Sequence, residues 1–173
     1  MDGSHPPPGG QFSPVADKAE AAAGLGDLSV CERVLEHAEQ VRGMGRESQT
    51  GGWLRFDGPR LPEQRGTCYT QLGKPDLAEM SLQQALSLPV SLRLRGSVLV
   101  DLANVGVMRR DVEQTVNYAT AAMELTGQSG SGVIARKLAG VNRQLPAAHR
   151  RDARLLRLSE DISACLAIER SSL

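Results

Sequence analysis

The fold is decided by the stretch GTCYTQLGKPDLAEMSLQQALSLP, residues 66–89. Small and aliphatic residues recur there at intervals of three and four, which is the period of an amphipathic helix. The sequence Gly73-Lys74-Pro75 interrupts the pattern, because glycine ends helices and proline fits the first turn of the next one. A connection this short makes the two helices antiparallel neighbours. The stretch therefore predicts a helical hairpin.

The same periodicity continues on both sides of this hairpin. It predicts helices at about 14–24, 27–42, 61–72, 76–88, 92–109, 111–126, 131–145 and 147–168. No stretch alternates apolar and polar residues in the manner of a strand. The sequence thus predicts an all-α domain over residues 14–168. A flexible tail rich in proline and glycine is expected at 1–13, and a short C-terminal tail at 169–173.

The hairpin also carries the signature of a known repeat. Gly66, Tyr69, Ala78, Leu82 and Ala85 stand at the offsets of the tetratricopeptide repeat, a helical hairpin of about 34 residues, which this stretch resembles. Small residues in such a hairpin let the two helices approach closely, and larger ones fill the groove between successive hairpins. The resemblance implies an α-solenoid of antiparallel helical hairpins.

Two weaker copies flank the central one. The downstream copy, offset by 37 residues, comprises Leu102-Ala103, Asp111, Thr115, Ala119 and Ala122, and the upstream copy comprises Ala19, Gly26-Asp27, Cys31, Leu35 and Ala38. A plain antiparallel helix bundle would also produce matches of this quality. The solenoid is therefore the favoured interpretation, with the bundle as the alternative.

The chain is also similar to the C-terminal helical-repeat region of helix-turn-helix regulators from high-GC bacteria. The similarity rests on residues 53–57, 65–78 and 98–103 and on the arginine-rich last helix. In those regulators the repeats are thought to sense a peptide, a small ligand or a partner, and a DNA-binding domain precedes them. Here a Pro/Gly-rich tail stands in that place. We therefore expect no direct nucleic-acid binding from this chain, which would be a stand-alone relative, a truncated product or a fragment.

The family resemblance also implies a binding groove. Its groove positions correspond to Arg60, Glu63, Thr67, Thr70 and Gln71 of the central copy and to Ser97 and Asn104 of the next. These residues are polar where a core would be apolar, so we expect them to face solvent. Arg60 and Asn104 would anchor a peptide carboxylate or backbone. The expected partner is a protein or peptide, or a small ligand, and a homodimer stays open.

Composition bounds the remaining function classes. The chain has 20 basic and 20 acidic residues, so its net charge gives no general attraction to nucleic acid or to an anionic membrane. Aromatic residues are 3% of the chain, which predicts an aliphatic core. Three widely spaced cysteines predict no disulfide framework and a reducing cytoplasm. No apolar run reaches the roughly 20 residues that span a bilayer, and the N-terminus does not resemble a signal peptide.

No catalytic or metal-binding motif is evident. His5, His37 and His149 lack partners at metal-ligand spacing, and Cys68 lacks a nearby base, so it is expected to be a small buried apolar residue. The Gly130-Ser131-Gly132 sequence matches no phosphate-binding loop and predicts a hinge with a helix cap at Ser131. We expect no enzyme, cofactor or metal. The alternative function is an enzyme accessory or catalytic helical bundle whose pocket the sequence does not reveal.

Two further features stay open. Residues 1–41 carry a net charge of −5 and residues 131–173 one of +4, with Arg150, Arg154 and Arg157 on one face of the last predicted helix. This face is expected to be solvated, with an acidic partner as the alternative. The glycine-rich segment 43–60 contains Trp53 and Phe56, which are expected to pack against neighbouring helices. A long loop of this kind is otherwise functional.

Overall fold

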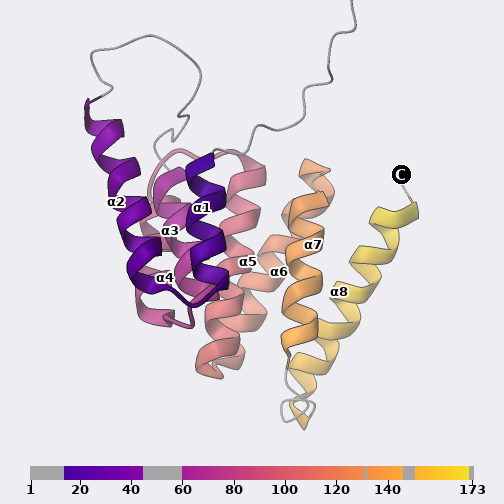
Figure 1. The fold of residues 1–173 in the computed structure, drawn as a ribbon. Helices are drawn as coiled ribbons and strands as arrows, with labels where there is room; N and C mark the ends of the chain where they lie inside the picture. The colour runs from indigo at the N-terminus through magenta and orange to yellow at the C-terminus, as the bar shows by residue number, and fades with distance from the viewer. Residues whose placement is uncertain (1–13, 45–59, 131, 146–150, 172–173) are drawn as a thin grey trace, which may run out of the picture.

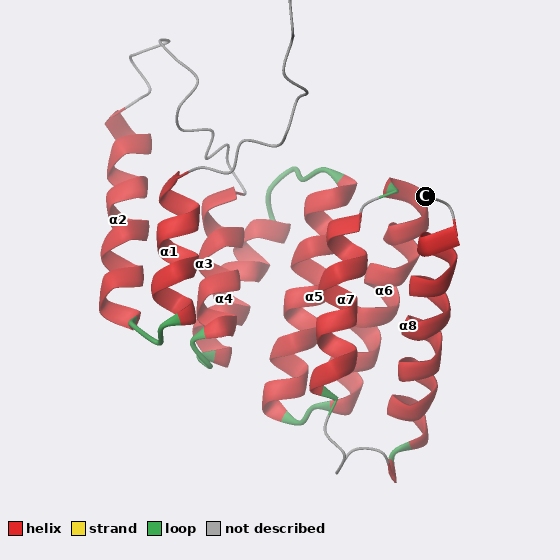
Figure 2. Ribbon diagram, turned by 45° about the vertical axis from the view of Figure 1, so that its right-hand side comes forward, coloured by secondary structure: helices red, strands yellow, loops and turns green. Residues whose placement is uncertain are grey.

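The computed structural model describes residues 14–44, 60–130, 132–145 and 151–171, which form eight α-helices and no strand (Figures 1 and 2). The helices are α1 (Pro14–Gly24), α2 (Leu28–Met44), α3 (Arg60–Gln71), α4 (Pro75–Leu86), α5 (Leu92–Arg109), α6 (Val112–Ser129), α7 (Gly132–Gln144) and α8 (Ala153–Ser171). The prediction of an all-α domain is confirmed. The predicted tail at 1–13 and the segment around Trp53 and Phe56 lie outside the described residues.

Each helix packs against the next one along the chain. The contact between α2 and α3 is smaller than that between any other consecutive pair. In addition, α1 contacts α3, α3 contacts α5, and α5 contacts α7. The four odd-numbered helices therefore follow one another in a continuous row, as Figure 2 shows from α1 to α7. The last helix, α8, packs against both α6 and α7. Among the described residues, no helix combines the length and the apolar character needed to cross a membrane.

The helix ends have identifiable causes. The backbone N–H of Leu94 donates to the side chain of Ser91 at the start of α5, and that of Gln114 donates to Asp111 at the start of α6. Helices α5 and α6 both end in a left-handed residue, Arg110 with φ 58° and Gly130 with φ 56°. Glycine adopts this conformation without the steric cost that other residues carry.

Two helix boundaries differ from the sequence-based prediction. Helix α6 continues through Gly127 to Ser129, because an exposed glycine inside a helix weakens it without ending it. Helix α8 begins at Ala153 rather than near residue 147. The side chain of Asp152 accepts from the backbone N–H of Arg154, so it caps the first turn there. The same helix extends to Ser171, past the predicted end at 168.

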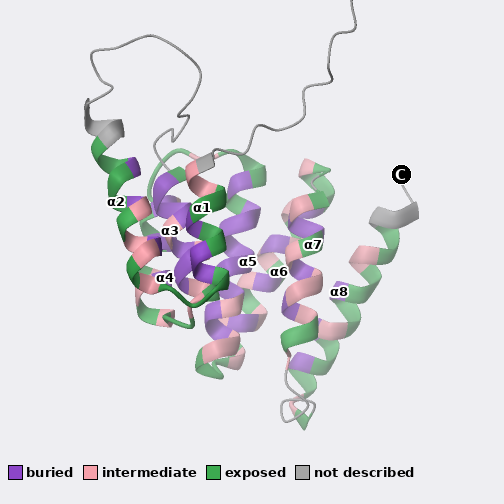
Figure 3. Cartoon of the chain, in the orientation of Figure 1, coloured by how far each residue is buried: buried purple, intermediate pink, exposed green. Residues whose placement is uncertain are grey.

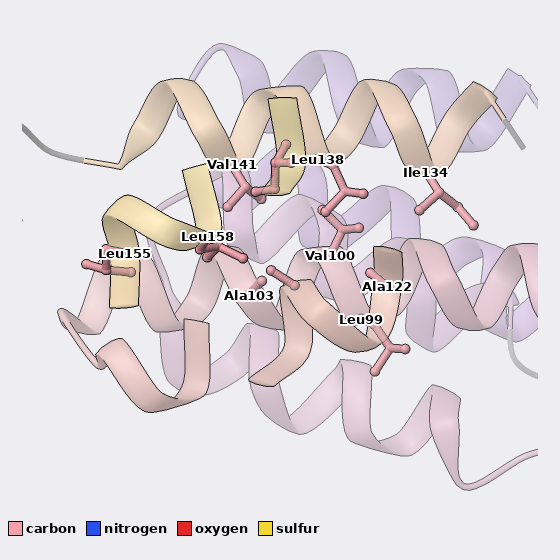
Figure 4. Packing of buried hydrophobic residues seen from close by; sticks show 11 residues of the cluster. Leu99, Val100, Ala103, Ala122, Ile134, Leu138, Val141, Leu155 and Leu158 are labelled. Carbon is pink, nitrogen blue, oxygen red and sulfur yellow. The ribbon is translucent and has the colours of Figure 1, made fainter. Parts of the chain in front are cut away.

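The core is aliphatic and divides into three clusters. The largest joins α5, α6, α7 and α8 through residues such as Leu99, Ile134 and Leu158 (Figure 4). A second joins α3, α4 and α5, and includes Leu82 and Leu102. The buried residues lie mainly along the inward faces of the helices, as Figure 3 shows.

The third cluster joins α1 and α2 to α3 and is built mostly from small side chains. It contains five residues that are alanine or cysteine in α1 and α2, together with two leucines and Cys68: Ala19, Ala22, Ala23, Cys31, Leu35, Ala38, Leu61 and Cys68. Buried apolar area scales with side-chain size, so this cluster contributes less stability per residue than the other two.

Close helix approach depends on glycine at two positions. A Cβ on Gly66 would lie 2.4 Å from Cδ2 of Leu82, so only glycine lets α3 come this near to α4. A Cβ on Gly106 would lie 2.7 Å from the backbone nitrogen of Thr115, where α5 meets the first turn of α6. In both hairpins the two helices therefore pack closely at a glycine, which has no side chain to separate them.

Candidate functional site

Polar side chains from three odd-numbered helices meet inside the row. Ser97 of α5 donates to Oε1 of Glu63 of α3 at 3.2 Å, and Thr67 of α3 donates to Oδ2 of Asp101 of α5 at 2.7 Å. The ammonium of Lys137, from α7, donates to Oγ of Ser97 and to Oδ2 of Asp101, both at 2.7 Å. We call these five residues the interhelical network.

A separate hydrogen bond joins α3 to α1, and the network itself has a regular spacing. The side-chain amide of Gln64 donates to Oε1 of Glu20 at 2.8 Å, which links α3 to α1. Glu63 and Thr67 are four residues apart on α3, and Ser97 and Asp101 are four apart on α5, so each pair occupies one helix face. The two hydrogen bonds between α3 and α5 both join residues separated by 34 positions.

The network is largely withdrawn from water. Glu63, Ser97 and Asp101 are 8%, 5% and 3% exposed, and the side chain of Lys137 is 25% exposed. Burial raises the pKa of Glu63 above its usual range, and the nearby charge of Lys137 opposes that change. Burial lowers the pKa of Lys137, but the carboxylates of Asp101 and Glu63 more than offset this, so its pKa is raised. The amine of Lys137 is therefore expected to carry its positive charge at neutral pH.

The structure brings three of the seven predicted groove residues into this network, namely Glu63, Thr67 and Ser97. Arg60 is the first residue of α3 and Gln71 is the last, and both are exposed. They lie on the same helix face as Glu63 and Thr67, one on each side of the network. The remaining two are half-buried. The hydroxyl of Thr70 donates to the carbonyl of Gly66 within α3, and Oδ1 of Asn104 is buried without a hydrogen-bond partner.

The expectation that all seven side chains face solvent is wrong for Glu63 and Ser97. They lie where α3, α5 and α7 pack together, and hydrogen bonds to each other and to Lys137 replace water there. A polar residue in a helical pattern usually indicates a surface position. In this chain it instead marks a contact between two helices.

Sequence reasoning missed the two residues that complete the network. Asp101 interrupts the apolar run Val98-Leu99-Val100-Asp101-Leu102-Ala103, where a charged residue needs a buried partner. That interruption was a usable signal. Lys137 is one of three lysines among 20 basic residues, but nothing in its immediate sequence indicates a partner on α5. Its pairing depends on how α7 packs against α5.

One contact in the network resembles part of a catalytic site. The contact between Ser97 and Lys137 has the form of a nucleophile beside a base, but a base must be neutral and Lys137 is protonated. Ser97 is also too buried to meet a substrate. Within the described ranges, no group of three or more His, Cys, Asp or Glu residues is placed to hold a metal ion.

A separate hollow lies between α1 and α2. It has a volume of about 390 Å³ and is lined by three valines and three nitrogen-bearing side chains: Val15, Val30, Val34, Lys18, Arg33 and His37. The hollow is open and contains none of the predicted groove residues. Its place at the N-terminal end of the helix row separates it from the interhelical network.

Comparison of this chain with family models, with curated proteins and with solved structures finds no match.

Proposed function

We propose that the chain is a recognition module that binds a protein or peptide segment along the exposed side of α1, α3, α5 and α7. In this proposal the fold is an α-solenoid of hairpins that resemble tetratricopeptide repeats. One observation carries it: polar residues cross the whole row of odd-numbered helices, and the bonds between α3 and α5 join positions 34 apart. A spacing close to the repeat length is expected where equivalent positions of successive repeats adjoin.

The exposed part of this face offers anchors of different kinds. Arg60 supplies a cationic donor at one end of α3, and Gln71 supplies an amide at the other. The side chains of Thr67 on α3 and Asn104 on α5 are half-buried, and the Oδ1 atom of Asn104 is itself buried without a hydrogen-bond partner. An extended peptide presents backbone N–H and C=O groups at regular intervals, which such polar side chains bind. A small ligand is the second class of partner.

The biological setting that we propose is bacterial regulation, in which this module is the sensor of a transcriptional regulator or a stand-alone relative. A catalytic bundle is less well supported, because the network has a protonated lysine and a buried serine in place of an accessible nucleophile and a neutral base.

The test has two stages. Tagged protein first captures partners from a high-GC bacterial lysate, and mass spectrometry identifies them. Binding of each partner is then titrated against the wild type and against Arg60→Ala/Gln71→Ala. The matched control is Arg157→Ala/Gln128→Ala, which removes the same two residue types from exposed positions on α8 and α6.

We expect the first double variant to raise the Kd by about tenfold or more, equivalent to roughly 1.4 kcal/mol, and the control to leave it unchanged. Both should melt within about 0.5 kcal/mol of the wild type, as exposed substitutions generally do. If instead the α8 control weakens binding, with a steep dependence on salt, the partner binds the basic C-terminal helix and the proposed face is wrong.

A further inference from the structure

Two of the three cysteines, distant in sequence, meet in the core. Cys31 of α2 and Cys68 of α3 are both 0% exposed and belong to the same buried cluster, where their thiols influence each other. Both are reduced. The amide of Gln64 also donates to Sγ of Cys68 at 3.9 Å. The third cysteine, Cys165, lies on α8 and belongs to a different part of the helix row.

The two helices that carry this pair are weakly joined. Helix α2 makes few contacts with α3, and the cluster between them consists mostly of alanine and cysteine side chains. Less buried apolar area means a smaller free energy to separate the α1–α2 hairpin from α3 than to open the larger clusters. We expect this hairpin to separate from α3 more readily than the larger clusters open, with the Arg65–Glu39 ion pair and the hydrogen bond from Tyr69 to Glu32 among the polar contacts that must break.

We propose that Cys31 and Cys68 form a reversible intramolecular disulfide that ties α2 to α3 when the protein meets a two-electron thiol oxidant. With a diazene dicarboxamide as oxidant, one thiolate adds to the N=N bond. The second thiolate then attacks that sulfur and expels the hydrazine. The two thiols lose two protons and two electrons, the diazene gains them and becomes the hydrazine, and one S–S bond forms. A dithiol reductant reverses the reaction by thiol–disulfide exchange.

The closed fold protects the thiols of Cys31 and Cys68 from oxidation, and their shared burial brings them near enough for a disulfide to form. Burial raises the pKa of both thiols, so little thiolate exists while the hairpin is closed. Oxidation is therefore limited by how often the α1–α2 hairpin opens. When it closes again, the two thiols return to the same buried cluster, and bonding requires the sulfurs to approach to about 2.05 Å with the rotamers adjusted accordingly. This inference is independent of the proposed binding function.

The experiment oxidises the full-length reduced protein with diamide at a small molar excess under native conditions. Thiols are counted with maleimide after denaturation, and the linked peptides are mapped without reduction. Cys165→Ser is the matched control, since it should still oxidise, whereas Cys31→Ser and Cys68→Ser should not. We expect the thiol count of the wild type to fall from three to one, with Cys31 linked to Cys68. The thermal midpoint should rise and return after dithiothreitol.

The proposal also predicts a dependence on opening. Low, non-denaturing urea should accelerate oxidation several-fold, because it raises the population of the open hairpin. Peptide mapping of the oxidised wild type shows which cysteines are linked, even if a serine variant fails to fold. Three reactive thiols after oxidation, or linkage of Cys165 to either of the other two as the main product, would overturn the proposal.

Discussion

Replacing Lys137 by methionine removes the cation of the interhelical network and keeps most of the side-chain volume. The substitution leaves the carboxylate of Asp101, which is 3% exposed, with only the hydroxyl of Thr67 as a donor from the network. Breaking a buried ion pair by removing one partner costs about 3–5 kcal/mol. Because one hydrogen bond to Asp101 remains and Lys137 is 25% exposed, we expect the lower end, about 3 kcal/mol.

A second substitution, Asp101→Asn, should change the unfolding free energy in opposite directions in the two backgrounds. In the wild type, Asp101→Asn removes the counter-charge of Lys137 and should destabilise the protein by about 1–2 kcal/mol. In the Lys137→Met background it removes an unpaired buried charge, so the same substitution should stabilise the protein. Such a reversal is expected only where two residues are directly coupled.

The four proteins of this cycle are compared by urea unfolding at neutral pH, followed by far-ultraviolet circular dichroism. The deficit of Lys137→Met should also lower the thermal midpoint by roughly 6–12 °C for a chain of this length. Additive effects, in which Asp101→Asn destabilises both backgrounds equally, would refute the assigned pairing. So would a cost below about 1 kcal/mol for Lys137→Met.

Three further predictions concern packing and pH. Ala78→Arg should unfold the protein or cost about 3 kcal/mol or more, because Ala78 is fully buried between α3 and α4; Met80→Arg, at an exposed position of the same helix, should stay within about 0.5 kcal/mol by thermal melting. Gly106→Ala should destabilise by about 1–3 kcal/mol, since its Cβ would meet Thr115, whereas Gly127→Ala, with nothing within 4 Å, should stabilise by about 0.5–1 kcal/mol. The native pKa of Glu63 is raised above 4.5, so the folded protein binds more protons than the unfolded chain between the two pKa values, and the unfolding free energy attributable to Glu63 falls as pH rises through that window. Urea midpoints across this range should therefore be flatter for Glu63→Gln, and a parallel pH dependence in both proteins would contradict the assignment.

The helices were predictable because their signals are local. The apolar period, Pro75 after Gly73, and the Gly24 to Gly26 stop all act within a turn or two of the residues that they define. The start of α8 was missed although its signal is local too, since Asp152 was not recognised as a cap. Caps compete with alternative starts nearby, and the apolar period alone does not choose between them.

The candidate site was only partly predictable because it depends on contacts between helices. The polar character of Glu63, Thr67 and Ser97 was visible, but their burial was not, since burial is set by how closely α3, α5 and α7 pack. The pairing of Cys31 with Cys68 was equally hidden, because their spacing in sequence matches no motif. A sequence pattern predicts the faces of a single helix, whereas the contacts of these polar residues and cysteines join several helices.

The equal spacing of the two bonds between α3 and α5 has a consequence for how the chain selects its alignment. Apolar helix faces tolerate sliding by one turn, about 5.4 Å, because one leucine substitutes for another in the contact. A slide of α3 by one turn in one direction would set Glu63 against Asp101, placing two carboxylates together; in the other direction it would leave Asp101 without Thr67. The first alignment places like charges together, and the second breaks both hydrogen bonds between α3 and α5. The polar residues between these helices thus discriminate against neighbouring registers, which the aliphatic core beside them does not distinguish.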